Sequence, residues 1–439
     1  MNVLQKKYGV ISLGCDKNRV DTEKMLAILG AENITNDMSE AEVIIVNTCA
    51  FLESARKEAI DTVFECNSYR ENGKLEKIVM TGCLSQKFID ELFDEFKEVD
   101  VFLGISDYEL LPTAIERAYT GERVNFVGKK SEFLSMERVV TTPVHYAYLK
   151  IADGCNNRCT YCLIPSIRGK YRSETIEDLV KETKALGDIR ELILVAQDTT
   201  RYGEDLYQKP SLTRLIKELS ALETVGHIRL LYCYPDMIDD ELINEIRDNE
   251  KVLKYLDIPL QHSDKTVLKR MNRKGSGETY ERLIEKLRYE IPNIAIRSTF
   301  IAGFPGETEE NFQNLIEFLK RVKLTNAGFF AYSREEGTPA YKLDGQIDEE
   351  TKRIRVEKLY EVQKEISYKR NGELVGKTIK VVADGIDYEK QSFYGRAYFS
   401  APDIDGKVYL TSNEPIVQGE MYLVTIKTCD EYDLYGEIK

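Results

Sequence analysis

The feature that most restricts the fold is an alternation of short apolar runs and longer helix-like segments through the middle of the chain. Segments such as TIEDLVKETKALG and TEENFQNLIEFLKRV have the spacing of amphipathic helices. Between them lie six strand-like runs, at 147–153, 191–197, 228–234, 255–261, 294–302 and 327–333. Strands that alternate with helices form a parallel sheet. Six repeats therefore predict an incomplete version of the eightfold barrel, a partial (β/α)6 TIM-like barrel.

Two further units flank this predicted barrel, which we place at 143–370 and which ends in a long charged helix. Residues 1–120 show the same alternation and predict an N-terminal parallel α/β sheet, with strand-like runs at 8–13, 42–47 and 77–82. Residues 121–142 are polar and less regular, and we expect a linker there. Residues 371–439 hold short strand-like runs broken by Gly, Asp and Asn, which predict a small antiparallel β-barrel.

The composition is that of a globular protein. The chain has 439 residues, of which 42% are hydrophobic and 31% charged, and its length favours roughly two to four domains. The opening stretch, MNVLQKKYGVISLGC, lacks a signal-peptide pattern, and no apolar run is long enough for a membrane helix. We therefore expect a cytoplasmic protein without a membrane partner. The net charge of −14 argues mildly against a large nucleic-acid surface and permits a basic protein as partner.

Three of the nine cysteines follow the first strand of the predicted barrel, in the stretch DGCNNRCTYCLIP. They are Cys155, Cys159 and Cys162, with the spacing C-x3-C-x2-C. Nine cysteines in a cytosolic chain point to metal binding, catalysis or packing rather than to disulfides. The stretch lies at the C-terminal end of a strand, where the active sites of such barrels form.

The choice of metal depends on the number of ligands. A structural zinc site needs four, and the nearest histidine downstream is His227. Iron–sulfur clusters are also held by cysteine thiolates, normally four. Three thiolates would leave one iron open for a substrate or cofactor, as in a reactive metal site. A zinc loop or a chance grouping of cysteines stays open as the alternative.

With Tyr161 before its last cysteine, the motif resembles that of the radical S-adenosylmethionine enzymes. In that family the open iron binds the methionine part of the cofactor. The reduced cluster cleaves the cofactor to a radical that removes hydrogen from unactivated carbon. The segment IAGFPGE at 301–307 resembles the glycine-containing segment that passes by the cofactor. Gly303 lacks a Cβ, so its backbone can approach a ligand closely.

Three other cysteines are spread along the N-terminal unit. Cys15, Cys49 and Cys83 each follow a predicted strand, and 34 residues separate each from the next. Because ligands of an open parallel sheet lie beyond the carboxyl ends of its strands, the three thiols can converge there. The alternative is that they are buried small apolar side chains, as free cysteines often are. Packing is the role expected of Cys66, Cys233, within a strand, and Cys429.

Two cysteine sets followed by a small β-barrel resemble the layout of the methylthiotransferases over essentially the whole chain, with an N-terminal cluster domain, a radical core and a TRAM domain. The resemblance implies insertion of a methylthio group at a C–H bond, with an external electron donor and a sulfur source as further partners. It implies two [4Fe–4S] clusters and S-adenosylmethionine as cofactors. The ligands would be Cys15, Cys49 and Cys83 for the sulfur-carrying cluster and Cys155, Cys159 and Cys162 for the radical-generating cluster.

Within that family the chain resembles the RimO branch, which modifies the β-carbon of an aspartate in ribosomal protein S12. The resemblance rests on SLGCDKNRVDTE, LLYCYPD, YLDIPLQH and YDLYGE. The transfer-RNA branch, which modifies an adenosine, usually has Ser-Gly after the glutamine that corresponds to Gln261, where this chain has His262 and Ser263. Asp16 departs from the Pro that RimO proteins often have, but this position is not a ligand.

The charge of the C-terminal unit agrees with a protein target. Residues 371–439 hold 12 acidic and 7 basic residues, a net charge of −5, whereas RNA-binding TRAM domains are expected to be basic. Direct nucleic-acid binding stays open. So do two alternative functions, a transfer-RNA methylthiotransferase and a non-catalytic iron–sulfur or zinc module that binds RNA. We expect removal of the residues beyond Leu374 to weaken target binding and to spare cofactor cleavage.

Five residues besides the cysteines are expected at the cofactor, namely Tyr161, Gln197, Arg297, Gly303 and Gly306. We expect Tyr161 beside the adenine. Gln197 and Arg297 end or interrupt strands, and a salt-bridged strand end is the alternative for each. His262 is expected to be structural, and alternation does not decide whether Asp257 and Arg229 point into the barrel. No residue pair has the pattern of a general acid and base, so no catalytic residue is expected beyond the cluster ligands.

Overall fold

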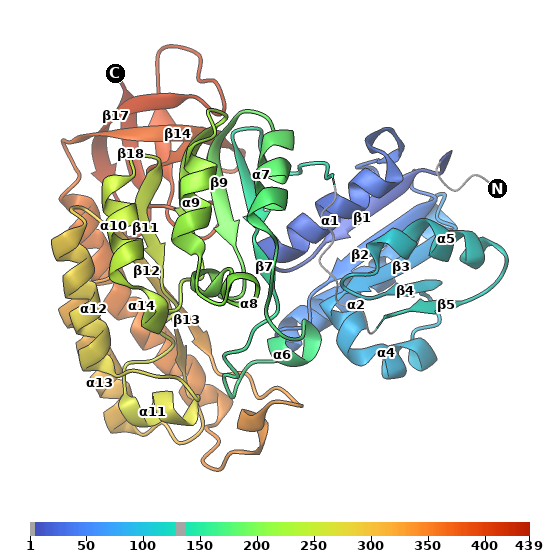
Figure 1. Cartoon of the computed structure of the whole chain (residues 1–439), viewed down its shortest axis with the longest axis horizontal. Helices are drawn as coiled ribbons and strands as arrows, with labels where there is room; N and C mark the ends of the chain where they lie inside the picture. The colour runs from blue at the N-terminus through green and yellow to red at the C-terminus, as the bar shows by residue number, and fades with distance from the viewer. Residues whose placement is uncertain (1–4, 129–136) are drawn as a thin grey trace.

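The computed structural model describes residues 5–128 and 137–439 and has three packed units (Figure 1). Residues 1–4 of the opening stretch and residues 129–136 of the predicted linker lie outside the described residues. The N-terminal unit is a five-stranded parallel sheet in the order β1-β2-β3-β4-β5. Its strands are β1 (Tyr8–Ser12), β2 (Val43–Thr48), β3 (Lys77–Gly82), β4 (Val101–Leu103) and β5 (Val124–Phe126).

Helices cover both faces of this sheet because its strands are apolar on both sides. In β2, Val43 and Ile45 pack with residues of α1 and α5, whereas Ile44 and Val46 pack with residues of α2 and α4. The helices are α1 (Asp16–Leu29), α2 (Glu53–Asn67), α3 (Tyr69–Asn72), α4 (Cys83–Glu95) and α5 (Leu111–Tyr119).

Two strands of this sheet were not predicted. β4 and β5 have three residues each, which is too short for a pattern of alternation to be read from the sequence. β5 pairs with β4 and lies within residues 121–142, where the sequence predicted only a linker. The N-terminal sheet therefore extends into that segment.

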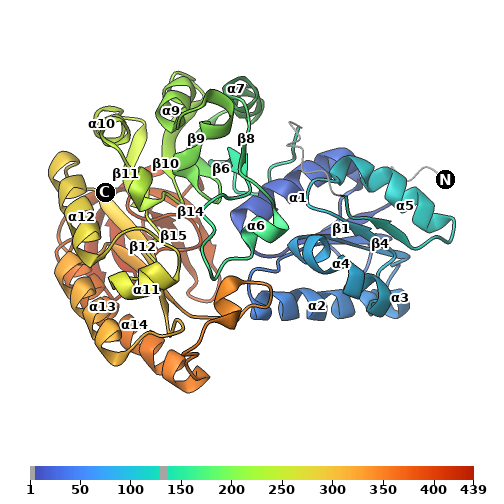
Figure 2. The same ribbon diagram turned by 60° about the horizontal axis from the view of Figure 1, so that its bottom comes forward.

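The central unit is a six-stranded, wholly parallel sheet in the order β13-β12-β11-β10-β9-β6. Strand and helix alternate as the sequence predicts, and the sheet curves into a half-barrel (Figure 2). The strands are β6 (Tyr146–Lys150), β9 (Ile189–Val195), β10 (Val225–Leu230), β11 (Val252–Asp257), β12 (Ala295–Ala302) and β13 (Asn326–Ala331). Cys233 was expected within a strand, but β10 ends before it and Cys233 is buried in the segment that follows.

The two sides of the half-barrel have different partners. Leu149, Leu194 and Leu256 pack with the outer helices, while Tyr148 and Tyr255 pack with the C-terminal barrel. The main helices are α7 (Ile176–Ala185), α9 (Leu212–Ser220), α10 (Asp240–Asp248), α12 (Gly277–Glu290), α13 (Glu309–Val322) and α14 (Glu349–Gly372). Shorter elements are β7 (Ala152–Asp153), α6 (Ile164–Ile167), β8 (Arg172–Ser173), α8 (Glu204–Tyr207) and α11 (Lys265–Arg270).

The C-terminal unit is a closed barrel in the order β14-β15-β16-β18-β17. Its strands are β14 (Thr378–Asp387), β15 (Ser392–Arg396), β16 (Val408–Thr411), β17 (Met421–Cys429) and β18 (Leu434–Ile438). The sequence predicted an antiparallel barrel, and four of the five pairs are antiparallel, but β16 and β18 run parallel. The chain places β17 between β14 and β18, so the last strand closes the barrel beside β16 in the same direction.

The C-terminal barrel packs against the inner face of the half-barrel. Val381 and Val424 of the barrel share one apolar cluster with Tyr148, Ile193 and Tyr255 of the central strands. The N-terminal unit lies beside the central unit, next to α6 (Figure 1). Within the described residues, no helix combines the length and the apolar character that crossing a membrane requires.

Candidate functional site

The second cysteine set, which is Cys155, Cys159 and Cys162, lies on the loop that follows the first strand of the half-barrel. β7 and β8 pair at the base of this loop, and the backbone N–H of Cys155 donates to the carbonyl of Gly169 at 3.2 Å. Inside the loop, the N–H of Cys162 donates to the carbonyl of Cys159 at 3.1 Å. The predicted site thus stands at the C-terminal end of a barrel strand, where parallel sheets bind ligands.

The pKa of Cys155 is raised to about 11 and that of Cys162 to about 12. Burial is the main cause in both cases, and the nearby Cys159 contributes to both shifts. Arg273 donates to the Cys159 sulfur at 3.8 Å and lowers the pKa of Cys162. The Tyr234 hydroxyl lies 3.8 Å from the Cys159 sulfur. A guanidinium stabilises a thiolate, which is the form that binds metal.

In the first cysteine set, which is Cys15, Cys49 and Cys83, two of the three members stand at the start of a helix. Cys15 immediately precedes α1 and Cys83 is the first residue of α4, where the helix dipole favours a thiolate. Gly14 has a φ of +90°, and a Cβ on it would lie 2.7 Å from the Cβ of Cys49, so glycine lets these loops touch. The pKa of Cys83 is raised to about 12, mainly by burial and in part by Cys15 and Cys49, while Arg168 lowers it. The three thiols lie within electrostatic reach of one another.

Asn18 on α1 ties the loops of the first set together. Its Nδ2 donates to the carbonyl oxygens of Leu13 at 2.9 Å and Thr48 at 3.1 Å, which lie just before the first two cysteines. Its Oδ1 lies 3.9 Å from the sulfur of Cys83. One buried amide therefore contacts all three cysteine-bearing loops.

Arg168, directly after α6, joins the two cysteine sets. Its Nη2 donates to Asn18 Oδ1 at 2.6 Å and to the Cys83 sulfur at 3.7 Å. Its Nη1 donates to Asp153 at 2.8 Å, and the other oxygen of Asp153 accepts the N–H of Gly154 at 2.8 Å. Since Asp153 lies two residues before the second set, a single buried guanidinium links the two sets.

In comparisons with known proteins, a separate family model matches each of the three units of the structure. Three family models match the chain: Uncharacterized protein family UPF0004 over residues 7–104, the Radical SAM superfamily over 149–319 and the TRAM domain over 375–438. The ribosomal protein uS12 methylthiotransferase RimO of Acetivibrio thermocellus is 45% identical and covers 99% of this chain and 99% of its own. The same-named protein of Clostridium botulinum is 48% identical, over 99% of this chain and 98% of its own. The chain belongs to the RimO family. It is a radical S-adenosylmethionine methylthiotransferase with an iron–sulfur cofactor.

Solved structures resemble the RimO-family chain in fold. The radical S-adenosylmethionine methyltransferase TsrM of Kitasatospora setae, solved with cobalamin and a [4Fe-4S] cluster, has a TM-score of 0.57 at 14% identity and covers 76% of this chain and 77% of its own. The cobalamin-dependent radical enzyme OxsB, solved with aqua-cobalamin, has a TM-score of 0.52 at 14% identity, over 76% of this chain and 54% of its own. At this identity the likeness concerns the fold alone.

The donor set of each cysteine group fits an iron–sulfur cluster. Within residues 5–128 and 137–439, no three His, Cys, Asp or Glu side chains are grouped closely enough to bind a single metal ion. Iron–sulfur clusters are held by cysteine thiolates, and each cysteine set supplies three thiols. A pocket of about 320 Å³ lies beside the second set and is lined in part by Asn157, Tyr234 and Arg273.

The structure brings two of the predicted cofactor segments together. The ring of Tyr161 meets Phe304 of the GFPGE segment edge-on, with 6.4 Å between the ring centroids. Gly303 has a φ of +74°, and a Cβ on it would lie 2.3 Å from Lys352 Cγ, so a side chain of α14 accounts for this glycine. The N–H of Gly306 donates to the carbonyl of Gly345 at 2.8 Å. Roles of these residues at the cofactor stay predictions.

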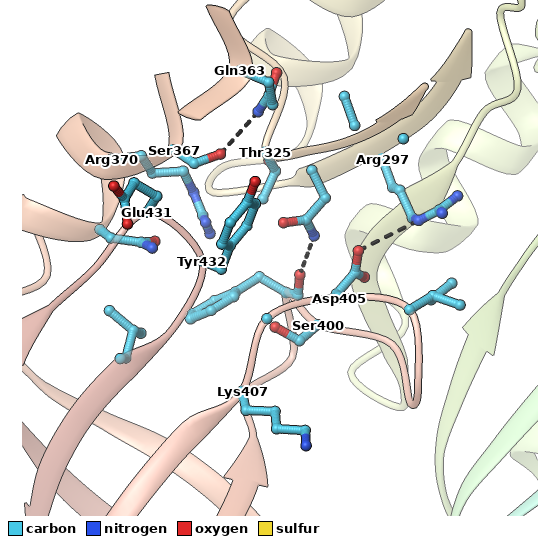
Figure 3. A pocket seen from close by; sticks show the side chains of 18 of the residues that line it. Arg297, Thr325, Gln363, Ser367, Arg370, Ser400, Asp405, Lys407, Glu431 and Tyr432 are labelled. Atoms are coloured by element: carbon cyan, nitrogen blue, oxygen red, sulfur yellow. Dashed lines mark hydrogen bonds and ion pairs between the residues drawn. The ribbon is translucent and has the colours of Figure 1, made fainter. Parts of the chain in front are cut away.

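Gln197 and Arg297 lie in different surroundings. Gln197 donates to Asp153 at 3.0 Å, and its buried Oε1 has no hydrogen-bond partner among the described residues. This places Gln197 at the second cysteine set. Arg297 forms ion pairs with Asp257 at 2.9 Å and Asp405 at 3.4 Å, at the edge of a pocket between β13, α14 and the C-terminal barrel (Figure 3). The ion pairs support the alternative of a salt-bridged strand residue for Arg297.

The remaining polar candidates pair with other groups inside the protein. His262 is fully buried, accepts the N–H of Asp264 at Nδ1 and faces Glu307 at 3.6 Å. Arg229 and Asp257, whose direction the sequence left open, both point inward. Arg229 contacts Glu191 at 2.6 Å, and Asp257 binds Arg297.

Sequence reasoning missed the polar residues that hold the thiols, namely Asn18, Asp153, Arg168, Tyr234 and Arg273. Asn18, Asp153 and Arg168 stand close in sequence to a cysteine, which was the available signal. Tyr234 follows β10 and Arg273 lies between α11 and α12, so only the fold brings them to Cys159.

Proposed function

We propose that this chain inserts a methylthio group at the β-carbon of an aspartate in ribosomal protein uS12, with two [4Fe–4S] clusters and S-adenosylmethionine as cofactors. The observation that carries the proposal is the position of the two three-thiol sets, which follow strands of two sheets, together with the buried guanidinium of Arg168, which contacts Cys83 and the Asp153 carboxylate just before the loop of Cys155. The uS12 target comes from the names of the full-length relatives.

In this proposal Cys15, Cys49 and Cys83 hold the sulfur-carrying cluster, and Cys155, Cys159 and Cys162 hold the radical-generating cluster. When bound, a cluster with one open iron supplies the electron that cleaves S-adenosylmethionine and thereby the means to break an unactivated C–H bond. An external electron donor and a sulfur source are further partners.

The residues of the chain itself contact the cysteine sulfurs, orient the loops that carry them and exclude water. Arg273 and Arg168 each donate to one cysteine sulfur. Asp153 fixes the start of the second loop, because its carboxylate accepts from Gly154, Gln197 and Arg168. Leu163 and Ile167, which follow the second set, are buried in the apolar core of the N-terminal unit. In this proposal their burial keeps water out of the space between the two sets.

The alternatives have less support. The relatives reported above carry the uS12 name, so a transfer-RNA substrate is not favoured, and the match to the Radical SAM superfamily disfavours a non-catalytic module. The acidic C-terminal unit, with a net charge of −5 over residues 371–439, suits a basic ribosomal protein more than a phosphate backbone.

The test is mass spectrometry of uS12 and of transfer RNA after anaerobic incubation with reconstituted protein, S-adenosylmethionine, a reductant and sulfide. We expect a methylthio mass gain on one aspartate of uS12. A gain on transfer RNA alone would keep the chemistry and refute the target. Production of 5′-deoxyadenosine without a gain on either substrate would refute both targets.

A further inference from the structure

The N-terminal cysteine set is completed by a residue from outside its own unit. We propose that Arg168 of the central unit is the positioning residue of this set: it fixes Asn18, the amide that ties the three cysteine loops, and places a permanent positive charge at Cys83. The inference rests on the proposed function, because it takes these cysteines to be ligands of a cluster.

Arg168 contacts both Asn18 and Cys83. Arg168 is 3% exposed, and its Nη2 donates to Asn18 Oδ1 at 2.6 Å, to Asp21 at 3.3 Å and to the Cys83 sulfur at 3.7 Å. Asn18 is fully buried and uses both hydrogens of its Nδ2 on the carbonyls of Leu13 and Thr48. The oxygen of this amide is thus free to accept from Arg168, and this bond sets the orientation of the whole amide.

The charges around Arg168 also favour this role. Around Arg168 lie Asp21, Asp153 and Lys150, so the two cations and two carboxylates of this buried group balance. A thiolate at Cys83 adds one negative charge, and Arg168 is the cation that touches the sulfur. Hydrogen bonds to the sulfurs and the net charge nearby set the reduction potential of an iron–sulfur cluster. Loss of Arg168 should therefore make reduction of this cluster harder.

Arg168 is also connected to the second set. Its Nη1 binds Asp153, whose backbone leads into the loop of Cys155. The side chain that sets the orientation of Asn18 is therefore anchored at the start of the radical loop. Movement of the N-terminal unit away from the central unit would break the contacts of Arg168 with Asn18 and Cys83 together.

The chain offers a matched control. Arg138 is also a buried arginine between α1 and the central unit, with Glu23 at 2.9 Å and Glu182 at 3.0 Å as its ion-pair partners. Arg138→Met therefore removes a buried charge from the same boundary while the bonds of Asn18 and Cys83 remain. A shift seen in Arg168→Met and not in Arg138→Met reports on the cysteine set rather than on packing between the units.

The first measurement uses full-length protein in which Cys155, Cys159 and Cys162 are all replaced by Ala, so that only the N-terminal set can be loaded. An EPR-monitored redox titration then compares Arg168, Arg168→Lys, Arg168→Met and Arg138→Met. We expect the midpoint to move to more negative potential in Arg168→Met, less in Arg168→Lys because lysine keeps the charge without the fork of donors, and not in Arg138→Met. An unchanged midpoint in a fully loaded Arg168→Met protein would overturn the inference.

The second measurement is hydrogen exchange in the metal-free protein, which needs no loaded cluster. The N–H of Leu13 donates to the carbonyl of Asn47 and the N–H of Asn18 to that of Cys15, in loops that the Asn18 amide holds. We expect faster exchange at residues 13–18 in Arg168→Met than in Arg138→Met. Equal exchange in the two variants would refute the positioning role. If the Cys155, Cys159 and Cys162 variant loads no cluster although Arg168 is intact, the proposed two-cluster function fails, and the exchange result still decides the role of Arg168.

Discussion

At the scale of single residues, each cysteine set has one arginine at one of its sulfurs, Arg168 at Cys83 and Arg273 at Cys159. Burial favours the neutral thiol, as the raised pKa values of Cys83 and Cys162 indicate. Because a guanidinium stays charged at every relevant pH, it offsets part of the cost of forming thiolates in these places. This pairing gives the two sets the same local chemistry although they lie on different sheets.

The two sets should nevertheless differ in function. Replacement of Cys155, Cys159 or Cys162 by Ala should abolish production of 5′-deoxyadenosine, because it removes a proposed ligand of the radical-generating cluster. Replacement of Cys15, Cys49 or Cys83 should leave that production in place and stop methylthio insertion. Chromatography of 5′-deoxyadenosine and mass spectrometry of uS12 on the same samples distinguish loss of cofactor cleavage from loss of methylthio insertion. Cys66→Ala is the control, since Cys66 is buried in α2 and should affect neither.

Glu191 should make acid stability depend on one buried carboxylate. Burial alone would raise its pKa, but Arg229 and Arg396 lower it from 4.5 to about 2. The stabilisation is therefore present above pH 4.5 and is lost as the pH falls toward 2, and the shift corresponds to roughly 3 kcal/mol. Glu191→Gln should lower the melting temperature of the metal-free protein at pH 7 and narrow its difference from the native chain at pH 3. An equal difference at both pH values would contradict this.

At the scale of elements, the sequence predicted what periodicity encodes. The six strands of the half-barrel and their helices are long enough for alternation and helical spacing to appear. The strands β1, β2 and β3, which precede the three N-terminal cysteines, were found for the same reason. The three-residue strands β4 and β5 carry no such pattern. The parallel pair β16 and β18 depends on how the barrel closes, which local sequence does not encode.

The inward direction of Arg229 and Asp257 also escaped prediction. Both sides of the central strands are buried, one by helices and the other by the C-terminal barrel, so apolar residues fall on both faces and alternation is lost. For the candidate site, the six cysteines could be singled out because spacing and strand ends mark them. The arginines that contact them depend on tertiary packing.

The C-terminal barrel should be harder to remove than its place at the end of the chain suggests. Asp405 accepts from Tyr255 at 2.7 Å, and Arg396 binds Glu191 across the boundary with the half-barrel. A chain that ends after Leu374 would expose the inner face of the half-barrel and leave Arg229 and Glu191 as a partly unsatisfied buried pair. We therefore expect such a chain to melt at lower temperature and to aggregate, besides binding uS12 more weakly.

Thermal melting with light scattering, together with uS12 binding, measures these effects. The control is Tyr388→Ala, which changes a side chain that is 84% exposed on the same barrel and should leave melting unchanged. A truncated chain that melts like the full chain would show that the barrel is an independent attachment.

At the scale of the whole molecule, the three units share their cores. Leu163 and Ile167 of the central unit lie in the apolar cluster of the N-terminal unit, and Val20 of α1 lies in the cluster between the half-barrel and the C-terminal barrel. The loop after β13 adds Glu335, which accepts the N–H of Glu53 at 2.9 Å and pairs with Arg56. Each family model covers one unit, yet the packing makes the relative position of the units part of the site.

This boundary should respond to pH through Glu174. Burial is the largest cause that raises its pKa to about 7, with Lys24 of α1 lowering it and Glu182 raising it. Both oxygens of Glu174 lack a hydrogen-bond partner among the described residues. The folded chain therefore binds more protons than the unfolded chain between pH 4.5 and 7, and its stability falls as the pH rises through that range. The penalty is complete above pH 7 and amounts to roughly 3 kcal/mol at most.

Glu174→Gln removes this titration, so the variant should gain melting temperature over the native chain at pH 8 and gain little at pH 4.5. Metal-free protein is used for the melts, so that cluster loading does not enter the comparison. Glu177→Gln, an exposed change on the neighbouring helix α7, is the control and should follow the native chain at both pH values. A gain for Glu174→Gln that is the same at pH 4.5 and pH 8 would mean that the buried carboxyl stays protonated or finds a partner. In that case the boundary between the N-terminal and central units would not be sensitive to pH through this residue.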